Sequence, residues 1–414
     1  AYTVPDVFPG DLRAMRFDAD GNGYIEESAG GKVWLFFGAR NASRYFALDV
    51  TERHYPRLLW ELNGEDLPGA GETWSAPTLA RMRINGAEQN GEHIVIVVGG
   101  GYGTEEDGLG RRLFIIDAHS GRVLWLAGSD SDADLNLPAM RYAIPSRVAV
   151  LDADGDGFAD RLYVGDLGGQ LWRFDVANGE SRRELVSGGV LATLGAADPA
   201  AVIPADARQF FNAPDVTLIQ TRGAPAFHNL VIGSGDRAHP GDLQTQDRLY
   251  VIRDRLGPGE ITEHVPIRDA DLPEITGHQE VPLSAPGWKL SLRAGEKVLA
   301  EVVTAGSTAL VTTYQPDVAC GTNRLYALRV DSAQPALDLN GDGEVTPADM
   351  SETLAQTGIA GEVRITWDPP RPGNPGESPP PTPHSRCHVG EELLSGCPQI
   401  SRTTRTFWYR RGVD

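Results

Sequence analysis

One short acidic stretch has the residue types and the spacing of a metal site. In "LDADGDGFADRLYVGDLGGQLWRFD", residues 151–175, four aspartates fall within nine residues. Carboxylates this close repel one another, and a hairpin turn needs only one Asn-Gly or Asp-Gly pair, so a cation is expected among them. Gly157 stands at position 6 of a calcium loop. The ligands of positions 1, 3, 5, 7 and 9 are then Asp152, Asp154, Asp156, the Phe158 carbonyl and Asp160.

The ligand set indicates both the ion and the scaffold. Hard oxygen ligands without a nearby His or Cys favour Ca²⁺ over zinc or copper. An EF-hand would continue to a bidentate Glu at position 12 inside a helix, but position 12 here is Tyr163, and "RLYVGD" has the composition of a strand. We therefore predict a calcium-binding hairpin on a β-scaffold. The alternative interpretation is a solvated acidic turn without an ion.

Two further loops fit the same template less completely. In "LDLNGDGEVTPADM" Gly343 stands at position 6, and Pro347 begins a short amphipathic helix, so residues 337–358 resemble an EF-hand or dockerin half-site inserted in the chain. Its expected ligands are Asp338, Asn340, Asp342, the Glu344 carbonyl and Asp349. In "FDADGNGYIEES" the expected ligands are Asp18, Asp20, Asn22, the Tyr24 carbonyl and Glu26. Ranked by template ligands, the Asp152 loop comes first, the Asp338 loop second and the Asp18 loop third.

Composition limits the class of protein. The 57 acidic residues against 37 Lys and Arg give a formal charge of -20, which disfavours nucleic acids and anionic membranes as partners. The 48 glycines and 29 prolines favour a chain with many turns. No apolar run approaches the roughly 20 residues that span a bilayer. The start "AYTVPDVFPG" has neither an initiator Met nor a signal peptide, so we expect a soluble, mature or excised piece of a longer protein.

The three cysteines favour an oxidising compartment. Cys387 and Cys397 flank a loop short enough to bridge, so this pair is the first choice for a disulfide. Cys320 is then either free or the true partner of one of them. An extracellular or periplasmic location fits this pattern better than the cytosol.

Strand-like runs with turns between them recur along the chain, and long helical periodicity is almost absent. A shared unit emerges, in which an aromatic residue and two apolar residues precede Asp or Arg. It occurs at 46–49, 114–117, 250–253 and 326–329, and at 172–175 with Arg173 in place of the first apolar residue. Irregular units of roughly 40 to 60 residues predict a β-propeller, with a pair of β-sandwiches as the alternative. The Pro-rich stretch 368–383 reads as a loop or linker.

The segment "IPSRVAVLDADGDGFADRLYVGDLGGQLWRFDV" resembles the PilY/PilC-type family of type IV pilus tip-associated adhesins. The resemblance extends in order over most of the chain. It includes "ALDVTERHYPRLLWE", "TWSAPTLARM", "VVGGGYG", "QFFNAPDV", "VIGSGDRAHP" and the closing "RTFWYRR". It implies that residues 1–414 form one modified β-propeller, the family's C-terminal domain, whose calcium loop is the Asp152 loop. We expect seven irregular blades, calcium-binding hairpin loops and short helical insertions.

The resemblance also implies a function. Family members regulate pilus extension and retraction and support surface attachment and twitching motility. The implied partners are minor pilins at the pilus tip and a host or abiotic surface, and the implied location is secreted or on the bacterial cell surface at the pilus tip, with periplasmic or outer-membrane association. The family's N-terminal half is absent from this chain, and so is the Arg-Gly-Asp motif of some members.

An enzyme is the rival interpretation. The pattern "DAHSGRVLW", residues 117–125, resembles the tryptophan-docking repeat of quinoprotein dehydrogenase propellers, but only this copy is complete. We therefore interpret this motif as a packing contact between blades. The nine histidines lack metal-ligand spacing, and neither G-x-S-x-G, H-E-x-x-H nor a P-loop is present. We expect a protein that is not an enzyme and has no small-molecule substrate.

Overall fold

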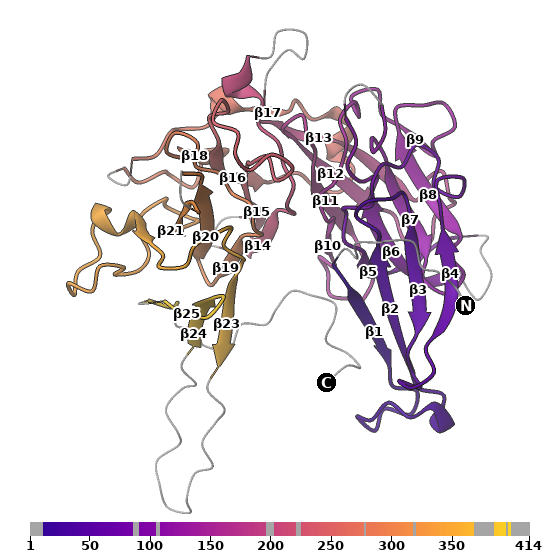
Figure 1. Ribbon diagram of the computed structural model, residues 1–414. Coiled ribbons are helices and arrows are strands. Elements are labelled where there is room, and N and C mark those ends of the chain that lie inside the picture. Colours follow the sequence, from indigo (N-terminus) through magenta and orange to yellow (C-terminus); the bar gives the residue numbers. More distant parts are fainter. Residues whose placement is uncertain are drawn as a thin grey trace, which may run out of the picture. The chain divides into compact units, whose positions relative to one another are not determined.

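The computed structural model describes residues 11–85, 91–104, 108–195, 203–220, 225–276, 279–317, 320–367, 385–394 and 396–398. The chain divides into two compact units (Figure 1). The first unit contains the chain up to Thr193 together with Leu256–Pro266. The second contains Leu194–Arg255 and the described residues from Ile267 to Pro398.

The first unit is built from three antiparallel meanders of strands that follow one another in sequence. The first meander is β1 (Arg13–Phe17), β2 (Lys32–Gly38), β3 (Tyr45–Asp49) and β4 (Arg57–Leu62). The second is β5 (Thr78–Arg83), β6 (Glu92–Gly99), β7 (Leu113–Asp117) and β8 (Val123–Gly128), to which β9 (Leu135–Asn136) adds in parallel. The third is β10 (Ala149–Leu151), β11 (Arg161–Gly165), β12 (Gln170–Val176) and β13 (Val186–Thr193). The 3-10 helices among the described residues of this unit include η1 (Glu27–Ala29) and η5 (Glu260–Glu263).

The middle sheet of this unit is covered by apolar residues on both faces. Side chains alternate between the faces of a strand, and β6 is a nearly continuous apolar run instead of an alternating one. Its Ile96 and Val98 join the core shared with the first sheet, whereas Val95 and Val97 join the core shared with the third. The sheets therefore stack face to face through successive apolar layers, as the blades of a propeller do.

The second unit repeats the same arrangement. Its first sheet is β14 (Asp215–Ile219), β15 (Phe227–Gly233), β16 (Arg248–Asp254) and β18 (Gly287–Ser291). Its second sheet is β19 (Val303–Ala305), β20 (Thr308–Gln315), β21 (Thr322–Arg329) and β22 (Ser351–Thr353). Its third sheet is β23 (Val363–Trp367), β24 (Ser385–Val389) and β25 (Glu392–Leu393). The remaining elements are β17 (Ile267–Arg268), η4 (Pro204–Asp206), η6 (Asp269–Asp271) and η7 (Pro347–Met350). One core lies between the first two sheets and another between the last two.

The repeated sequence unit has one structural meaning. All five copies lie on the third strand of their sheet, namely β3, β7, β12, β16 and β21. The predicted fold class is confirmed, because the regular secondary structure of the described residues consists of strands and short 3-10 turns, and the sheets are propeller-like. Seven blades and a single domain over 1–414 stay predictions. The Pro-rich stretch 368–383 and the closing "RTFWYRR" lie outside the described residues.

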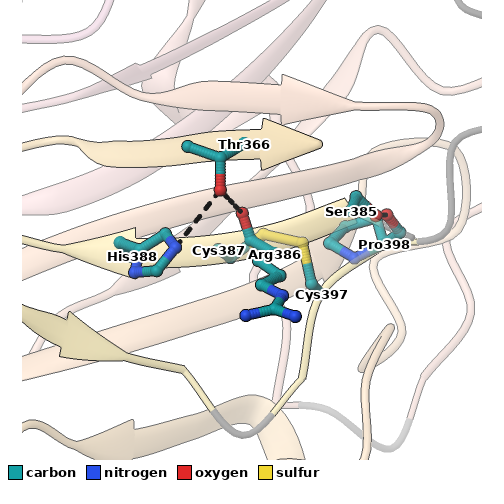
Figure 2. The surroundings of a disulfide bond; sticks show 7 residues. All are labelled: Thr366, Ser385, Arg386, Cys387, His388, Cys397 and Pro398. Carbon is teal, nitrogen blue, oxygen red and sulfur yellow. Dashed lines mark hydrogen bonds between the residues drawn. A yellow bond between two sulfur atoms is a disulfide. The ribbon is translucent and has the colours of Figure 1, made fainter. Parts of the chain in front are cut away.

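The expected disulfide is present. Cys387 on β24 bonds to Cys397, with their Cα atoms 5.3 Å apart, and Figure 2 shows the bridge between that strand and the chain after β25. Beside it the Ser385 hydroxyl donates to the Pro398 carbonyl. Cys320 is free and exposed.

Among the described residues, no helix has the length and apolar character needed to cross a membrane.

Candidate metal centre

The Asp152 loop closes the hairpin between β10 and β11, in which Leu151 pairs with Arg161. Its carboxylates first organise the backbone of the loop. Asp152 accepts hydrogen bonds from the N–H groups of Gly155 (2.7 Å) and Gly157 (2.9 Å). Asp154 Oδ1 accepts from the Asp156 N–H (2.9 Å), and Asp156 Oδ1 accepts from the Phe158 N–H (2.8 Å). Each acidic side chain is therefore held on the inside of a tight turn.

The resulting donor set fits calcium. One carboxylate oxygen each from Asp152, Asp154 and Asp156 lies within 4.8 Å of the other two. Oxygens bound at about 2.4 Å to one Ca²⁺ lie within about 4.8 Å of each other, so a single ion can reach all three. Gly155 and Gly157 make this possible, because their φ angles of 82° and 90° are in the left-handed region that favours glycine.

Asp160 closes the loop from its far end. Its Oδ2 accepts from the N–H groups of Ala153 (2.7 Å) and Asp154 (3.3 Å). Partial burial raises the pKa of Asp160, and the charges of Asp154 and Asp152 raise it further, against the lowering effect of these hydrogen bonds. The loop therefore holds negative charge at a cost that a bound cation would relieve.

The second half of the loop is anchored to the neighbouring sheet. The Phe158 ring is buried, with the guanidinium groups of Arg83 and Arg81 3.7 and 4.6 Å from its centre. The Ala159 N–H donates to the Arg81 carbonyl (2.8 Å), and the Asn178 amide donates to the Ala159 carbonyl (2.9 Å). These contacts fix Phe158, whose carbonyl is the predicted ligand at position 7. Sequence reasoning missed the two arginines, because they lie more than 70 positions earlier in the chain.

The Asp338 loop has the same backbone hydrogen bonds at the same positions. Asp338 accepts from the N–H groups of Gly341 (2.7 Å) and Gly343 (2.8 Å). Asn340 accepts from the Asp342 N–H and Asp342 from the Glu344 N–H, both at 2.9 Å. The predicted helix from Pro347 is limited to the 3-10 turn η7, after which the chain continues as β22.

Asp349, at position 12, closes this loop. It is fully buried and accepts from the N–H groups of Leu339 (3.1 Å) and Asn340 (3.2 Å), which occupy positions 2 and 3. Asp160, which stands at position 9 of the Asp152 loop, likewise accepts hydrogen bonds from the N–H groups of positions 2 and 3 of that loop. The N–H of Thr346 and the other donors to Asp349 lower its pKa, so this carboxylate is ready to bind a cation.

The Asp18 loop connects β1 and β2 and repeats only part of this arrangement. Asp18 accepts from Gly21 (2.9 Å) and Gly23 (2.7 Å), and the Gly23 bond is the largest cause of its lowered pKa. Asn22 accepts from the Tyr24 N–H (2.7 Å). Within residues 11–85, no carboxylate closes this loop as Asp160 and Asp349 close theirs, and Glu26 instead precedes η1. Of the three predicted ligand groups, the structure shows carboxylate oxygens within reach of one ion for the Asp152 loop, and ion binding at all three loops stays a prediction.

The quinoprotein-like motif has a structural use. Asp117 Oδ1 accepts from the Ser120 N–H (2.7 Å) and hydroxyl (2.8 Å), which closes the turn between β7 and β8. Trp125 at its end is fully buried in the core between the second and third sheets. This arrangement supports the interpretation of the motif as packing between sheets.

Comparison with known proteins identifies relatives of this chain. No protein-family model matches it. A type IV pilus biogenesis factor PilY1 homolog of Xylella fastidiosa is 28% identical over 392 residues, which are 86% of this chain and 25% of that protein. PilY1 of Pseudomonas aeruginosa is 32% identical over 181 residues, which are 41% of this chain and 14% of that protein. The chain is related to the PilY1-type proteins.

A solved structure shows which part of those proteins this chain resembles in fold. The crystal structure of the Pseudomonas aeruginosa PilY1 C-terminal domain superposes with a TM-score of 0.63 and 21% identity, covering 88% of this chain and 80% of that one. The chain therefore has the fold of the PilY1 C-terminal domain. It spans a quarter or less of the length of these two curated PilY1 relatives. The relatives are named as pilus biogenesis factors and not as enzymes, which fits the prediction of a non-enzyme.

Proposed function

We propose that this chain is a calcium-binding domain of a type IV pilus biogenesis protein and that the Asp152 loop is its principal calcium site. The observation that carries the proposal is the cluster of three carboxylates whose oxygens one ion can reach, on a backbone already folded around that position. The relatedness to PilY1-type proteins supports the role in pilus biogenesis.

The finer role follows from the same relationship. The domain regulates pilus extension and retraction and supports surface attachment and twitching motility. Its partners are minor pilins and other components of the pilus tip, and a host or abiotic surface. It acts outside the cytoplasm, at the bacterial cell surface, where the Cys387–Cys397 disulfide is stable.

Calcium titration of single-loop variants tests the proposal. Asp156→Ala, Asp342→Ala and Asp20→Ala each remove one central ligand from one loop, so each is expected to reduce the stoichiometry of Ca²⁺ binding by one where the loop binds. Isothermal titration calorimetry of the whole chain measures this number. Asp236→Ala is the matched control, because Asp236 also accepts backbone hydrogen bonds in a tight turn, from Ala238 and His239, but outside the three loops.

The strongest expectation concerns Asp156→Ala. Equal stoichiometry in this variant and in the wild type would contradict the assignment of the Asp152 loop. Loss of one ion from Asp342→Ala or Asp20→Ala would add the second or third loop to the sites.

A further inference from the structure

A segment of the second half of the chain is docked on the first unit. Residues Leu256–Pro266, here called the strap, belong to the first unit although Arg255 before them and Ile267 after them belong to the second. The strap contains η5, whose Ile261 is only 2% exposed. His264 Nε2 lies 3.0 Å from the Leu191 carbonyl oxygen on β13.

A buried charge cluster on the third sheet holds the strap by its backbone. Arg173, which is fully buried on β12, donates to the carbonyls of Leu256 (3.0 Å) and Gly257 (2.7 Å). Asp175 on the same strand accepts from the Gly259 N–H (2.9 Å) and from Arg173. Charge-assisted hydrogen bonds of this kind are strong where water is excluded, and they lose their effect when one partner is displaced.

The same cluster is connected to the Asp152 loop. Arg161 directly follows Asp160, the last residue of the loop, and its Nε donates to Asp175 Oδ1 (3.0 Å). The Val176 N–H donates to the Asp160 carbonyl (2.8 Å). Asp175 therefore accepts a hydrogen bond from Arg161, next to the loop, through Oδ1 and one from Gly259 of the strap through Oδ2.

We propose that docking of the strap on the third sheet depends on whether a cation is bound in the Asp152 loop. This inference rests on the proposed calcium binding. Without the ion, Asp160 is repelled by Asp152 and Asp154, which displaces the start of β11 and weakens the grip of Arg161 on Asp175. With the ion, the loop closes and Arg161 and Arg173 hold Asp175 in place. The Gly259 N–H of the strap can then donate its hydrogen bond to Asp175. The strap is the two-state element that the ion biases.

Hydrogen exchange of the whole chain measures strap docking directly. In the wild type, saturating Ca²⁺ is expected to slow exchange of the amides of residues 257 and 259–262 about tenfold relative to chelator, within the usual range of coupling between sites. Arg161→Met keeps the length of the side chain but removes the connection to Asp175. It should still bind Ca²⁺ while losing the effect of the ion on the strap. Arg182→Met is the matched control, because Arg182 pairs with Asp134 away from the strap.

A second variant releases the strap without touching the charges. A Cβ at Gly189 would lie 2.9 Å from the Ile261 carbonyl oxygen, so Gly189→Ala pushes the strap away from β13. Because coupling is reciprocal, this variant should weaken Ca²⁺ binding at the Asp152 loop by the same factor by which Ca²⁺ slows exchange in the wild type.

The outcomes separate the two proposals. Absence of Ca²⁺ binding by the wild type in calorimetry would overturn the proposed function and this inference with it. Normal Ca²⁺ binding with unchanged exchange of residues 257 and 259–262 would overturn this inference alone. An Arg161→Met variant whose strap still responds fully to Ca²⁺ would also overturn it.

Discussion

Single buried carboxyls set part of the pH dependence of this protein. Asp166, in the turn between β11 and β12, is fully buried and accepts hydrogen bonds from Trp172 Nε1 (2.8 Å) and from the N–H groups of Gly168 and Gln170 (both 2.9 Å). Burial raises its pKa from 3.8 to about 7, which the hydrogen bonds only partly oppose. The folded state therefore holds this proton more tightly than the unfolded state, and acidification below pH 7 stabilises the fold through Asp166.

The difference in unfolding free energy between wild type and Asp166→Asn isolates this contribution. Stability of the wild type relative to the variant should rise by up to about 1.4 kcal/mol per pH unit as the pH falls from 7 toward 4. Urea unfolding in chelator at pH 8, 7, 6 and 5 measures it. Asp247→Asn is the matched comparison, because burial raises the pKa of Asp247 to about 6, so its curve should begin one unit lower. A difference that stays constant over this range would refute the assignment for Asp166.

At the scale of elements, the last described sheet depends on a covalent bond. β25 has only two residues, so β24 and the chain that follows gain little from strand pairing. Cys387 is fully buried with Leu310 and Leu325 in the core between the last two sheets, and the disulfide closes a loop with a sequence separation of 10. The bond therefore fixes a segment that short strands alone would hold weakly.

Removal of this disulfide should loosen that sheet first. The double substitution Cys387→Ser and Cys397→Ser is expected to cost about 3 kcal/mol, the chain-entropy value for a loop of this size. Hydrogen exchange should rise in 385–394 before it rises in β15 or β16. Cys320→Ser removes an exposed thiol and serves as the control. Equal exchange at 385–394 in the double variant and the control would show that packing, and not the disulfide, holds this sheet.

At the scale of the whole molecule, the proposed regulation of pili is tested in bacteria carrying the complete protein. Asp156→Ala should reduce the number of surface pili and the twitching rate in a retraction-competent strain, because the loop loses its ion and its repulsion is no longer offset. Pili are counted by microscopy and twitching is measured as zone diameter. The control is Asp236→Ala. Wild-type pili and twitching, together with a demonstrated loss of Ca²⁺ binding, would limit the ion to a structural role.

The loops and the strands could be predicted from the sequence because their causes are local. An Asp followed by Gly at positions 4 and 6 folds its own turn, since the side chain accepts the N–H groups of those glycines in all three loops. The aromatic-apolar unit marks the third strand of five sheets. It could be recognised because residues that pack against neighbouring sheets recur at the same place in each repeat.

The closing contacts were decided by tertiary structure. In the Asp152 loop, position 12 already belongs to β11, so the residue that closes the loop is Asp160 at position 9. In the Asp338 loop, the η7 turn brings Asp349, at position 12, back to the backbone N–H groups of positions 2 and 3. Arg81 and Arg83 reach Phe158, and Arg173 reaches the strap, from strands distant in sequence. Such contacts carry no local signal, because only the packing of the sheets brings residues from distant parts of the chain together.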